Sequence, residues 1–389
     1  MQAVYDKFAT QHAGVEWDIR LLQGGGPEWD RAARASVASG EPVGFIAING
    51  QQVRGWVRDG LLADLSADPE LRTVLARVPE TYHLTGPGED AVRAMPLALT
   101  GGVHTTGLYY NRALLDRAGI DVPRTFSDLE AAVAPLAALD AAPLVHCSGD
   151  VFFNEMLVTW VLPMVVGRNG DPIEFAERTV AGEIGYDSPE WIEALQIIAD
   201  LRRSGVLMEG SAAVDYAPMQ QLLLQGRVAM TYQGSWMLPA IQAGSPSVEF
   251  DLHVGLPPTI DGADRSRPIL AWTGIGIPAA SAPPSDTIRA FLEYASRPEV
   301  DRAVVEGLQA YSPIPDSNAA ISDELAREFL PMFDDAITPL DWLWEPEITA
   351  ELDSQVQGLV RGDVEPPAAA AAVAAVADEL RASGRSYVP

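Results

Sequence analysis

The chain has 389 residues, of which 48% are hydrophobic, and its mean hydropathy is +0.05. This length exceeds the size at which one hydrophobic core usually stops growing, so the sequence predicts two lobes and excludes global disorder. The formal net charge of −28 at pH 7 would repel a phosphate backbone and argues against nucleic-acid binding.

The first third of the chain alternates helical and extended patterns. Helices are predicted over residues 2–12, 28–38 and 53–58, and strands over residues 17–22 and 43–48. The second of these strands is apolar throughout, as is typical of a strand that is covered on both faces. The alternation predicts an α/β fold with a mainly parallel sheet.

The middle third is mostly helical. Residues 111–118 form a predicted helix that ends at Gly119, and Ser127 and Glu130 have the spacing of a capping box for the next helix. The apolar segment 151–166 predicts a long buried helix. Ser188 and Pro189 provide an N-cap and a first-turn proline for another helix. A helix over 216–225 and a strand over 228–232 follow.

Strand character returns over residues 252–278, and the rest of the chain is helical. Helices are predicted over 285–295, 298–307, 321–333, 346–361 and 367–383. Strand-rich segments therefore flank a helical block, which predicts a lobe built from discontinuous pieces of chain. The chain then crosses between lobes more than once, and such crossings form a hinge.

Several segments resemble one protein family in their order and spacing. They are GLYYNRALLDRAGI (107–120), VPRTFSDL (122–129), VAMTYQGSW (228–236), WTGIGIP (272–278) and YSPIP (311–315). Together they resemble the extracellular solute-binding proteins of bacterial carbohydrate ABC importers, family 1 type. Phe126 stands where that family usually has Trp.

The resemblance implies a two-lobed α/β fold of the periplasmic-binding-protein (Venus-flytrap) type. We expect lobe one to hold residues 1–105 and 250–308, and lobe two to hold 106–249 and 309–389. A mono- or oligosaccharide would bind in the cleft between the lobes, and the closed form would deliver it to a membrane permease.

The same resemblance implies a monomeric, extracytoplasmic protein without catalytic activity, cofactor or metal. It also implies export and a lipid anchor, with the export signal outside these residues. Family members begin with a strand ahead of the first helix, whereas this sequence begins at the helix. A trimmed or misassigned start would explain this, and a real absence would remove a central strand and impair binding.

Sugars present apolar C–H faces that stack on aromatic rings, and hydroxyls that need directional partners. Trp236 follows Gly234 and Ser235 directly after a predicted strand, where exposed backbone N–H groups are expected. The alternative role for this Trp is to fill the lobe core. Core or loop packing competes equally or better for Trp272, Trp344 and Tyr311.

Polar candidates come from loops at the ends of strands, because such loops line crevices in α/β sheets. Asn49 and Gln51 follow the strand over 43–48, although an ordinary Asn-Gly turn explains them equally well. Asp150 can accept hydrogen bonds from a sugar or cap the helix over 151–166. Thr105 lies near the first crossing between lobes.

Other classes of function are weaker. The sequence lacks a Gly-x-Ser-x-Gly elbow, a Walker motif and a His-Glu-x-x-His motif, and its five histidines are scattered singly. A binding protein for another solute, such as a polyamine, is the main alternative. A glycoside hydrolase would share the stacking Trp residues but needs two carboxyl groups at catalytic separation.

Overall fold

The structure is a computed structural model, and it describes residues 2–20, 26–40, 42–85, 90–244 and 250–384. The chain forms two compact units. Unit 1 consists of Met1–His104 with Ala271–Asp323, and unit 2 of Thr105–Leu270 with Glu324–Val388. This division differs from the expected lobes at Thr105 and in two segments, because Thr105 and residues 250–270 belong to unit 2 and residues 309–323 to unit 1.

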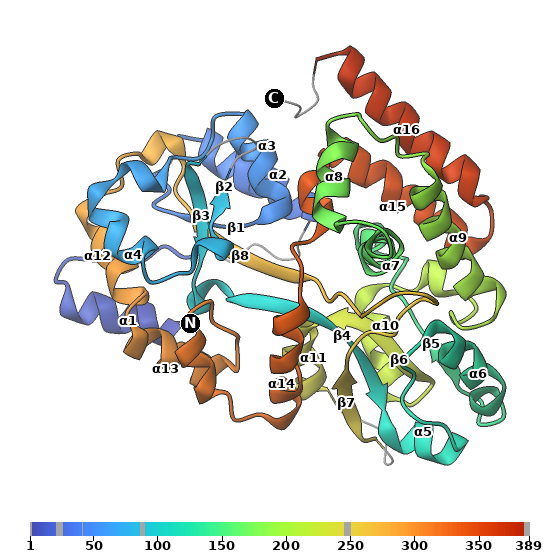
Figure 1. The fold of residues 1–389 in the computed structure, drawn as a ribbon. Coiled ribbons are helices and arrows are strands. Elements are labelled where there is room, and N and C mark those ends of the chain that lie inside the picture. Colours follow the sequence, from blue (N-terminus) through green and yellow to red (C-terminus); the bar gives the residue numbers. More distant parts are fainter. Residues whose placement is uncertain (1, 21–25, 41, 86–89, 245–249, 385–389) are drawn as a thin grey trace. The chain divides into compact units, whose positions relative to one another are not determined.

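Unit 1 is a small sheet covered by helices (Figure 1). Its central strand β8 pairs antiparallel with β1 and β3, and β2 pairs antiparallel with β3. The strands are β1 (Ile46–Asn49), β2 (Leu84–Thr85), β3 (Val92–Pro96) and β8 (Leu270–Gly276). The helices are α1 (Gln2–Gln11), α2 (Gly26–Ala38), α3 (Gly50–Arg58), α4 (Arg72–Leu75), α12 (Asp286–Ala295) and α13 (Pro298–Leu308).

Within unit 2, the strands pair in the order β7–β4–β6–β5. Its strands are β4 (Val103–Asn111), β5 (Ala142–Leu144), β6 (Val228–Gly234) and β7 (Leu252–Gly255). Its helices are α5 (Arg112–Ala118), α6 (Phe126–Ala137), α7 (Glu155–Gly167), α8 (Pro172–Val180), α9 (Pro189–Arg203), α10 (Tyr216–Leu224), α11 (Leu238–Ala243), α14 (Glu324–Glu328), α15 (Pro346–Arg361) and α16 (Pro366–Ala382).

The predicted parallel character of the sheet is wrong. Among the strand pairs described, β5 and β6 run parallel, whereas β4 runs antiparallel to β6 and to β7. An apolar run shows that a strand is buried on both faces but carries no information on the direction of its neighbour. The predicted strand at 17–22 is also not seen in its described part, because residues 17–20 have no regular structure.

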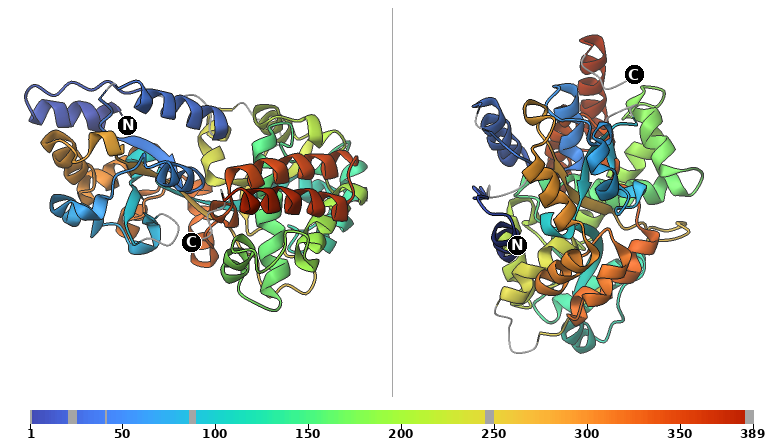
Figure 2. Two further views of the ribbon diagram at one scale, coloured as in Figure 1. Left: turned by 90° about the horizontal axis from the view of Figure 1, so that it is seen from above. Right: turned by 90° about the vertical axis from the view of Figure 1, so that its left-hand side faces the viewer.

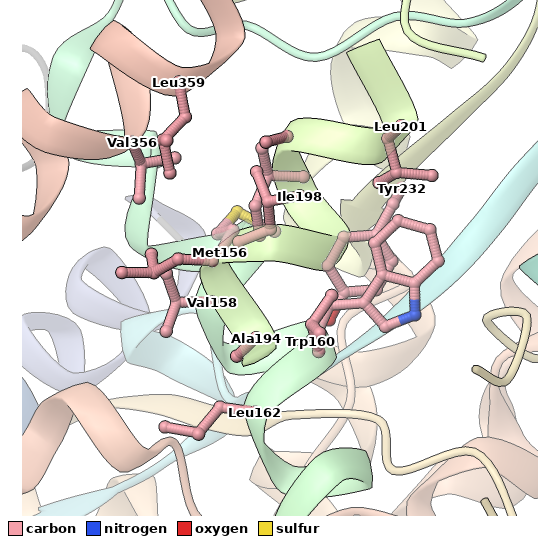
Figure 3. Packing of buried hydrophobic residues seen from close by; sticks show 14 of the residues in the cluster. Met156, Val158, Trp160, Leu162, Ala194, Ile198, Leu201, Tyr232, Val356 and Leu359 are labelled. Carbon is pink, nitrogen blue, oxygen red and sulfur yellow. The ribbon is translucent and has the colours of Figure 1, made fainter. Parts of the chain in front are cut away.

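The core of unit 2 is built around α7, whose residues Met156–Val166 are buried on every side. Trp160 lies at its centre. Its ring stacks on Tyr232 at a centroid distance of 4.5 Å (Figure 3). It also meets Phe126 edge-on at 4.8 Å. Its Nε1 donates to the backbone oxygen of Pro258 at 3.1 Å. A helix that is apolar all round is stable only inside such a core.

The last two helices run side by side over unit 2 (Figure 2). α16 is rich in Ala, and its buried positions include Val373 and Leu380. The prediction of a packed C-terminal helix is therefore confirmed. The predicted helix over 321–333 is instead interrupted, since α14 ends at Glu328 and a 3₁₀ segment covers Leu330–Asp335.

Helix starts and stops were predicted with mixed success. Gly119 takes the left-handed conformation that ends α5, with φ of 69°, and Pro189 begins α9 as expected. The capping box of α6 is not the predicted pair, because Thr125 is the N-cap and Asp128 its partner. Both spacings fit the motif, and the observed one places Phe126 in the core.

Among the described residues, no single helix is long and apolar enough to cross a membrane; one pair, 151–167 with 172–180, passes that test by length and composition but is bent by 110°.

Candidate functional site

In unit 2, several of the sequence-predicted residues meet at one edge of the sheet. β5 and β6 run parallel, so the segments that follow them leave the sheet at the same edge. Thr106 of β4 pairs with Gly234, which brings Thr105 to that edge as well. Gln233 Nε2 lies 3.6 Å from Sγ of Cys147 and thereby joins the segment before Asp150 to the end of β6. Thr105, Asp150, Gly234, Ser235 and Trp236 therefore belong to one neighbourhood.

Trp236 is a half-buried aromatic residue at this edge of the sheet. It lies in a 3₁₀ turn, Ser235–Met237, directly after β6. Its ring lies against the backbone of Gly234, because a Cβ placed on Gly234 would come within 2.2–2.3 Å of three ring atoms. Gly234 is therefore required for this position of the ring, and part of the ring stays exposed.

The neighbours of Trp236 mainly hold the backbone in place. Ser235 is buried, and its Oγ accepts a hydrogen bond from the backbone N of Thr105 at 3.4 Å. Thr105 is fully buried, and its Oγ1 has no hydrogen-bond partner among the described residues. Tyr109 Oη donates to the backbone oxygen of Gly234 at 2.9 Å.

Asp150 caps a helix, but not the one that was expected. Its Oδ2 accepts from the backbone N of Tyr216 at 2.7 Å and so caps the start of α10, whereas it makes no cap for the turn that follows it. Tyr216 stacks on Phe153 at 4.9 Å, and Phe153 contacts Phe152 at 4.4 Å. All three rings are half-buried, so a row of partly exposed aromatic rings adjoins Asp150.

Trp344 lies in the core of unit 2 and is 1% exposed. Its ring is 5.4 Å from that of Trp191. This placement matches the packing role that the sequence left open for Trp344, and contact with a solute is not needed to explain it.

The candidates in unit 1 lie around β8. Asn49 ends β1 opposite Thr273, and its Oδ1 accepts from the backbone N of Gln52 at 3.1 Å as the N-cap of α3. Gln51 is half-buried in the first turn of α3. Trp272 is buried and meets Tyr82 edge-on at 5.5 Å. Tyr311 is buried, and its backbone oxygen accepts from the N of Val103 at 2.8 Å.

Sequence reasoning missed a group of buried carboxyl side chains in unit 2. Glu155 begins α7, Asp341 lies in the 3₁₀ turn Leu340–Leu343, and Asp353 lies on the buried face of α15. Asp353 Oδ1 accepts from the backbone N of Glu155 at 2.7 Å. The signal was present, since Asp353 follows Leu352 and precedes Val356 on a helix face that otherwise carries apolar residues.

These three carboxyl groups hold protons more tightly than exposed ones. Burial raises the pKa of Asp341 and of Asp353 to about 7. Burial also raises the pKa of Glu155, and the negative charge of Asp353 raises it further. Removing a carboxylate from water without a cation beside it favours the neutral form.

Two other titratable groups at this edge, His146 and Cys147, stay uncharged near neutral pH. Burial lowers the pKa of His146 to about 4 and raises that of the Cys147 thiol. The adjacent thiol and imidazole therefore do not form an ion pair that would activate the sulfur. Among the described residues, no three His, Cys, Asp or Glu side chains are arranged to hold a metal ion.

Comparison with solved structures shows the fold. The chain superimposes on the GacH receptor of Streptomyces glaucescens GLA.O, which was solved unliganded and with acarbose, with a TM-score of 0.80 at 20% identity, covering 97% of this chain and 94% of that one. A chitin oligosaccharide binding protein matches with a TM-score of 0.81 at 17% identity, covering 98% and 95%. The raffinose complex of RafE matches with a TM-score of 0.74 at 19% identity, covering 98% and 95%. The chain therefore shares the fold of these three proteins.

Two curated relatives share parts of the sequence. A probable sugar-binding periplasmic protein of Rhizobium meliloti (strain 1021) is 21% identical over 225 residues, which is 57% of this chain and 52% of the relative. A probable sugar-binding periplasmic protein of Brucella suis biovar 1 (strain 1330) is 26% identical over 137 residues, 34% of this chain and 31% of the relative. The matches thus span about half and about a third of those proteins' lengths.

The family model described as bacterial extracellular solute-binding protein matches residues 1–302. This is a family of binding proteins and not of enzymes, and its model extends over both units. The chain belongs to the bacterial extracellular solute-binding proteins.

Proposed function

We propose that this protein captures a mono- or oligosaccharide outside the cytoplasm and delivers it to the permease of an ABC importer. The observation that carries the proposal is the half-buried ring of Trp236, held against Gly234 at the edge of the unit 2 sheet. An aromatic face of this kind takes the C–H face of a sugar ring, and it loses little entropy on ordering.

The neighbourhood of Trp236 favours a solute with more than one sugar ring. Phe152, Phe153 and Tyr216 form a further row of half-buried rings beside Asp150. The similar structures were solved with acarbose and raffinose, or are named for chitin oligosaccharides. We therefore rank oligosaccharides ahead of monosaccharides.

We further propose that units 1 and 2 act as the two lobes and close on the solute. The chain passes between the units three times, after His104, Leu270 and Asp323, and these crossings are the proposed hinge. Ligand would then shift the balance between open and closed forms. Periplasmic binding proteins as a class close around their ligands by hinge motion of this kind. In unit 1, the half-buried Asn49 and Gln51 remain the proposed contacts, whereas the burial of Trp272 and Tyr311 matches the packing role that the sequence left open for them.

The family fits a monomer outside the cytoplasm, and we propose lipid anchoring as the way in which it stays at the cell surface. A glycoside hydrolase is not retained, because the family is one of binding proteins. A polyamine binder remains the alternative solute class, since Asp150 beside the half-buried ring of Tyr216 would also suit a polyamine.

The test is a thermal-shift screen of mono- and oligosaccharides with polyamines as comparison, followed by calorimetric titration of each hit. A ligand at a hundredfold excess over its Kd adds about 2.7 kcal/mol to the free energy of unfolding. Trp236→Ala should weaken binding of the same sugar by about tenfold or more, the scale of one lost stacking contact.

Tyr110→Ala is the matched control. Tyr110 is a half-buried ring on the same sheet, but it pairs with Met230, four residues along β6 from Gly234. Its loss should leave the Kd unchanged. Stabilisation by a polyamine and by no sugar would overturn the proposed solute class. Equal losses in the two variants would overturn the role of Trp236.

A further inference from the structure

One helix of unit 2 holds both ends of the segment that carries Asp150. On α15, Asp353 accepts from the backbone N of Glu155 at 2.7 Å, while Gln357 donates from Nε2 to the backbone oxygen of Ser148 at 2.8 Å. Asp353 and Gln357 are four residues apart, so they lie one above the other on one face of the helix. The segment 148–155 is thus fixed from α15 at its first and last residues.

At the Glu155 end of the segment, two buried carboxyl groups, those of Glu155 and Asp353, lie next to each other. The bond from the backbone N of Glu155 to Asp353 brings the two carboxyl groups close together, and the negative charge of Asp353 raises the pKa of Glu155. Glu155 as a whole is half-buried, but its Oε2 is fully buried and has no hydrogen-bond partner in the described part of the chain. Asp353 is 4% exposed. Two carboxylates so close and so buried cannot both be ionised without a large cost.

Among the described residues, no basic side chain forms an ion pair with Glu155 or Asp353 that would replace a proton. The groups whose charges act on Glu155 and Asp353 are each other and Asp341. Glu155 in turn acts on Cys147, and Asp341 acts on Tyr232. Glu345, at the start of α15, is buried and also acidic.

The arginines of the packed helices lie elsewhere. Arg202 of α9 lies beside Gly362, at the far end of α15, and Arg381 of α16 lies beside Gly182. Across the described residues, none of Glu155, Asp341 and Asp353 forms an ion pair with a basic side chain.

We propose that Glu155 and Asp353 share one buried proton, and that loss of this proton releases the segment 148–155 and weakens solute capture as the pH rises. In the protonated form, the Glu155 carboxylic acid donates to the Asp353 carboxylate, which also accepts from the backbone N of Glu155. Removing the proton leaves two carboxylates in contact. The part that concerns solute capture rests on the proposed function, because Asp150 lies within this segment.

The direction of the pH dependence follows from the raised pKa values of these groups. The folded protein keeps a proton that the unfolded chain gives up above about pH 4, the ordinary range of a carboxyl group. Stability from this source is therefore greatest on the acid side and falls as the pH rises through the folded value, which is about 7 for Asp353. Between about pH 4 and this folded value, opening of the segment should increase by up to about tenfold per pH unit for a single proton, and it should level off above the folded value.

The test is hydrogen–deuterium exchange of the ligand-free protein from about pH 5 to about pH 8.5, corrected for intrinsic exchange. In the wild type, peptides covering 148–155 should open progressively up to about pH 7 and change little above it. In Glu155→Gln the amide still donates to Asp353 but carries no titrating proton, so the pH dependence of these peptides should be flat. Glu130→Gln, at an exposed acid on α6, makes the same charge change and should behave as wild type.

Two further measurements keep the outcome decisive. If Glu155→Gln does not fold, Asp353→Asn replaces it, with the same flat profile expected. The Kd of any solute found in the screen should rise with pH in the wild type and not in Glu155→Gln. Equal pH dependence of 148–155 in wild type and both variants overturns the shared proton. If exchange of 148–155 is independent of pH in Glu155→Gln but no solute in the screen binds, the shared proton stands and only the proposed function is overturned.

Discussion

The hydrogen bond at the centre of the unit 2 core gives a quantitative prediction. Trp160 is fully buried, and its Nε1 donates to the buried backbone oxygen of Pro258 at 3.1 Å. Trp160→Phe removes part of the apolar ring, worth about 1 kcal/mol for roughly 40 Å². It also leaves the Pro258 oxygen without a donor, which costs about 1–3 kcal/mol. We expect a total loss of about 2–4 kcal/mol.

Trp191 provides the matched comparison within the same core. It is 1% exposed, and its Nε1 has no hydrogen-bond partner among the described residues. Trp191→Phe therefore removes a similar area but no hydrogen bond, and it deletes a buried donor that is already unsatisfied. The two substitutions should differ by about 1–3 kcal/mol, with Trp160→Phe the more damaging.

The assay is equilibrium unfolding in guanidinium chloride, supported by calorimetry because two units need not unfold together. For a unit of about 230 residues, each kcal/mol lowers the Tm by about 2–4 °C, so Trp160→Phe should lower it by about 5–15 °C. Equal losses in the two variants, or a larger loss in Trp191→Phe, would refute the assignment of the difference to the Pro258 hydrogen bond.

Two other predictions concern a glycine and a histidine. Gly102 has φ of 72°, and a Cβ placed on it would come 1.8 Å from the backbone oxygen of Tyr311, whereas at Gly60, with φ of 66°, the space is open. Gly102→Ala should therefore lower the Tm clearly more than Gly60→Ala, and equal shifts would contradict the clash. His253 lies 2.6 Å from Glu328 and 3.3 Å from Asp251. Burial lowers the pKa of His253, but the two carboxylates raise it by a larger amount, so the net pKa lies above its ordinary value. The ion pair between His253 of β7 and Glu328 of α14 should stabilise the protein below about pH 6.5, and this stability should be lost as the pH rises through the folded pKa of His253. Thermal unfolding at several pH values checks this, and His253→Asn should remove this part of the pH dependence of the Tm.

The sequence by itself determined features that depend on nearby residues. The left-handed Gly119 ends α5 because only Gly adopts that conformation without strain, and Pro189 begins α9 because its missing N–H is not needed there. The apolar segment 151–166 is buried as α7, and Gly234-Ser235-Trp236 follows a strand as expected. The order of family-like segments then indicated the family, which the comparisons confirm.

Only the tertiary structure decided which distant groups meet. Asp150 could cap the turn after it, but the start of α10 lies beside it and takes the bond instead. Trp344 looked like a loop residue and is packed against Trp191. Glu155, Asp341 and Asp353 are far apart in the sequence, and no local pattern could place them together.

The physical reason lies in the range of the interactions. Turn, cap and periodicity signals act over about four residues, through the backbone hydrogen bonds of a single element. Strand direction, the partner of a buried carboxyl group and the exposure of a ring depend on how elements pack. That packing is chosen by the total apolar surface buried and the polar groups satisfied across the whole unit.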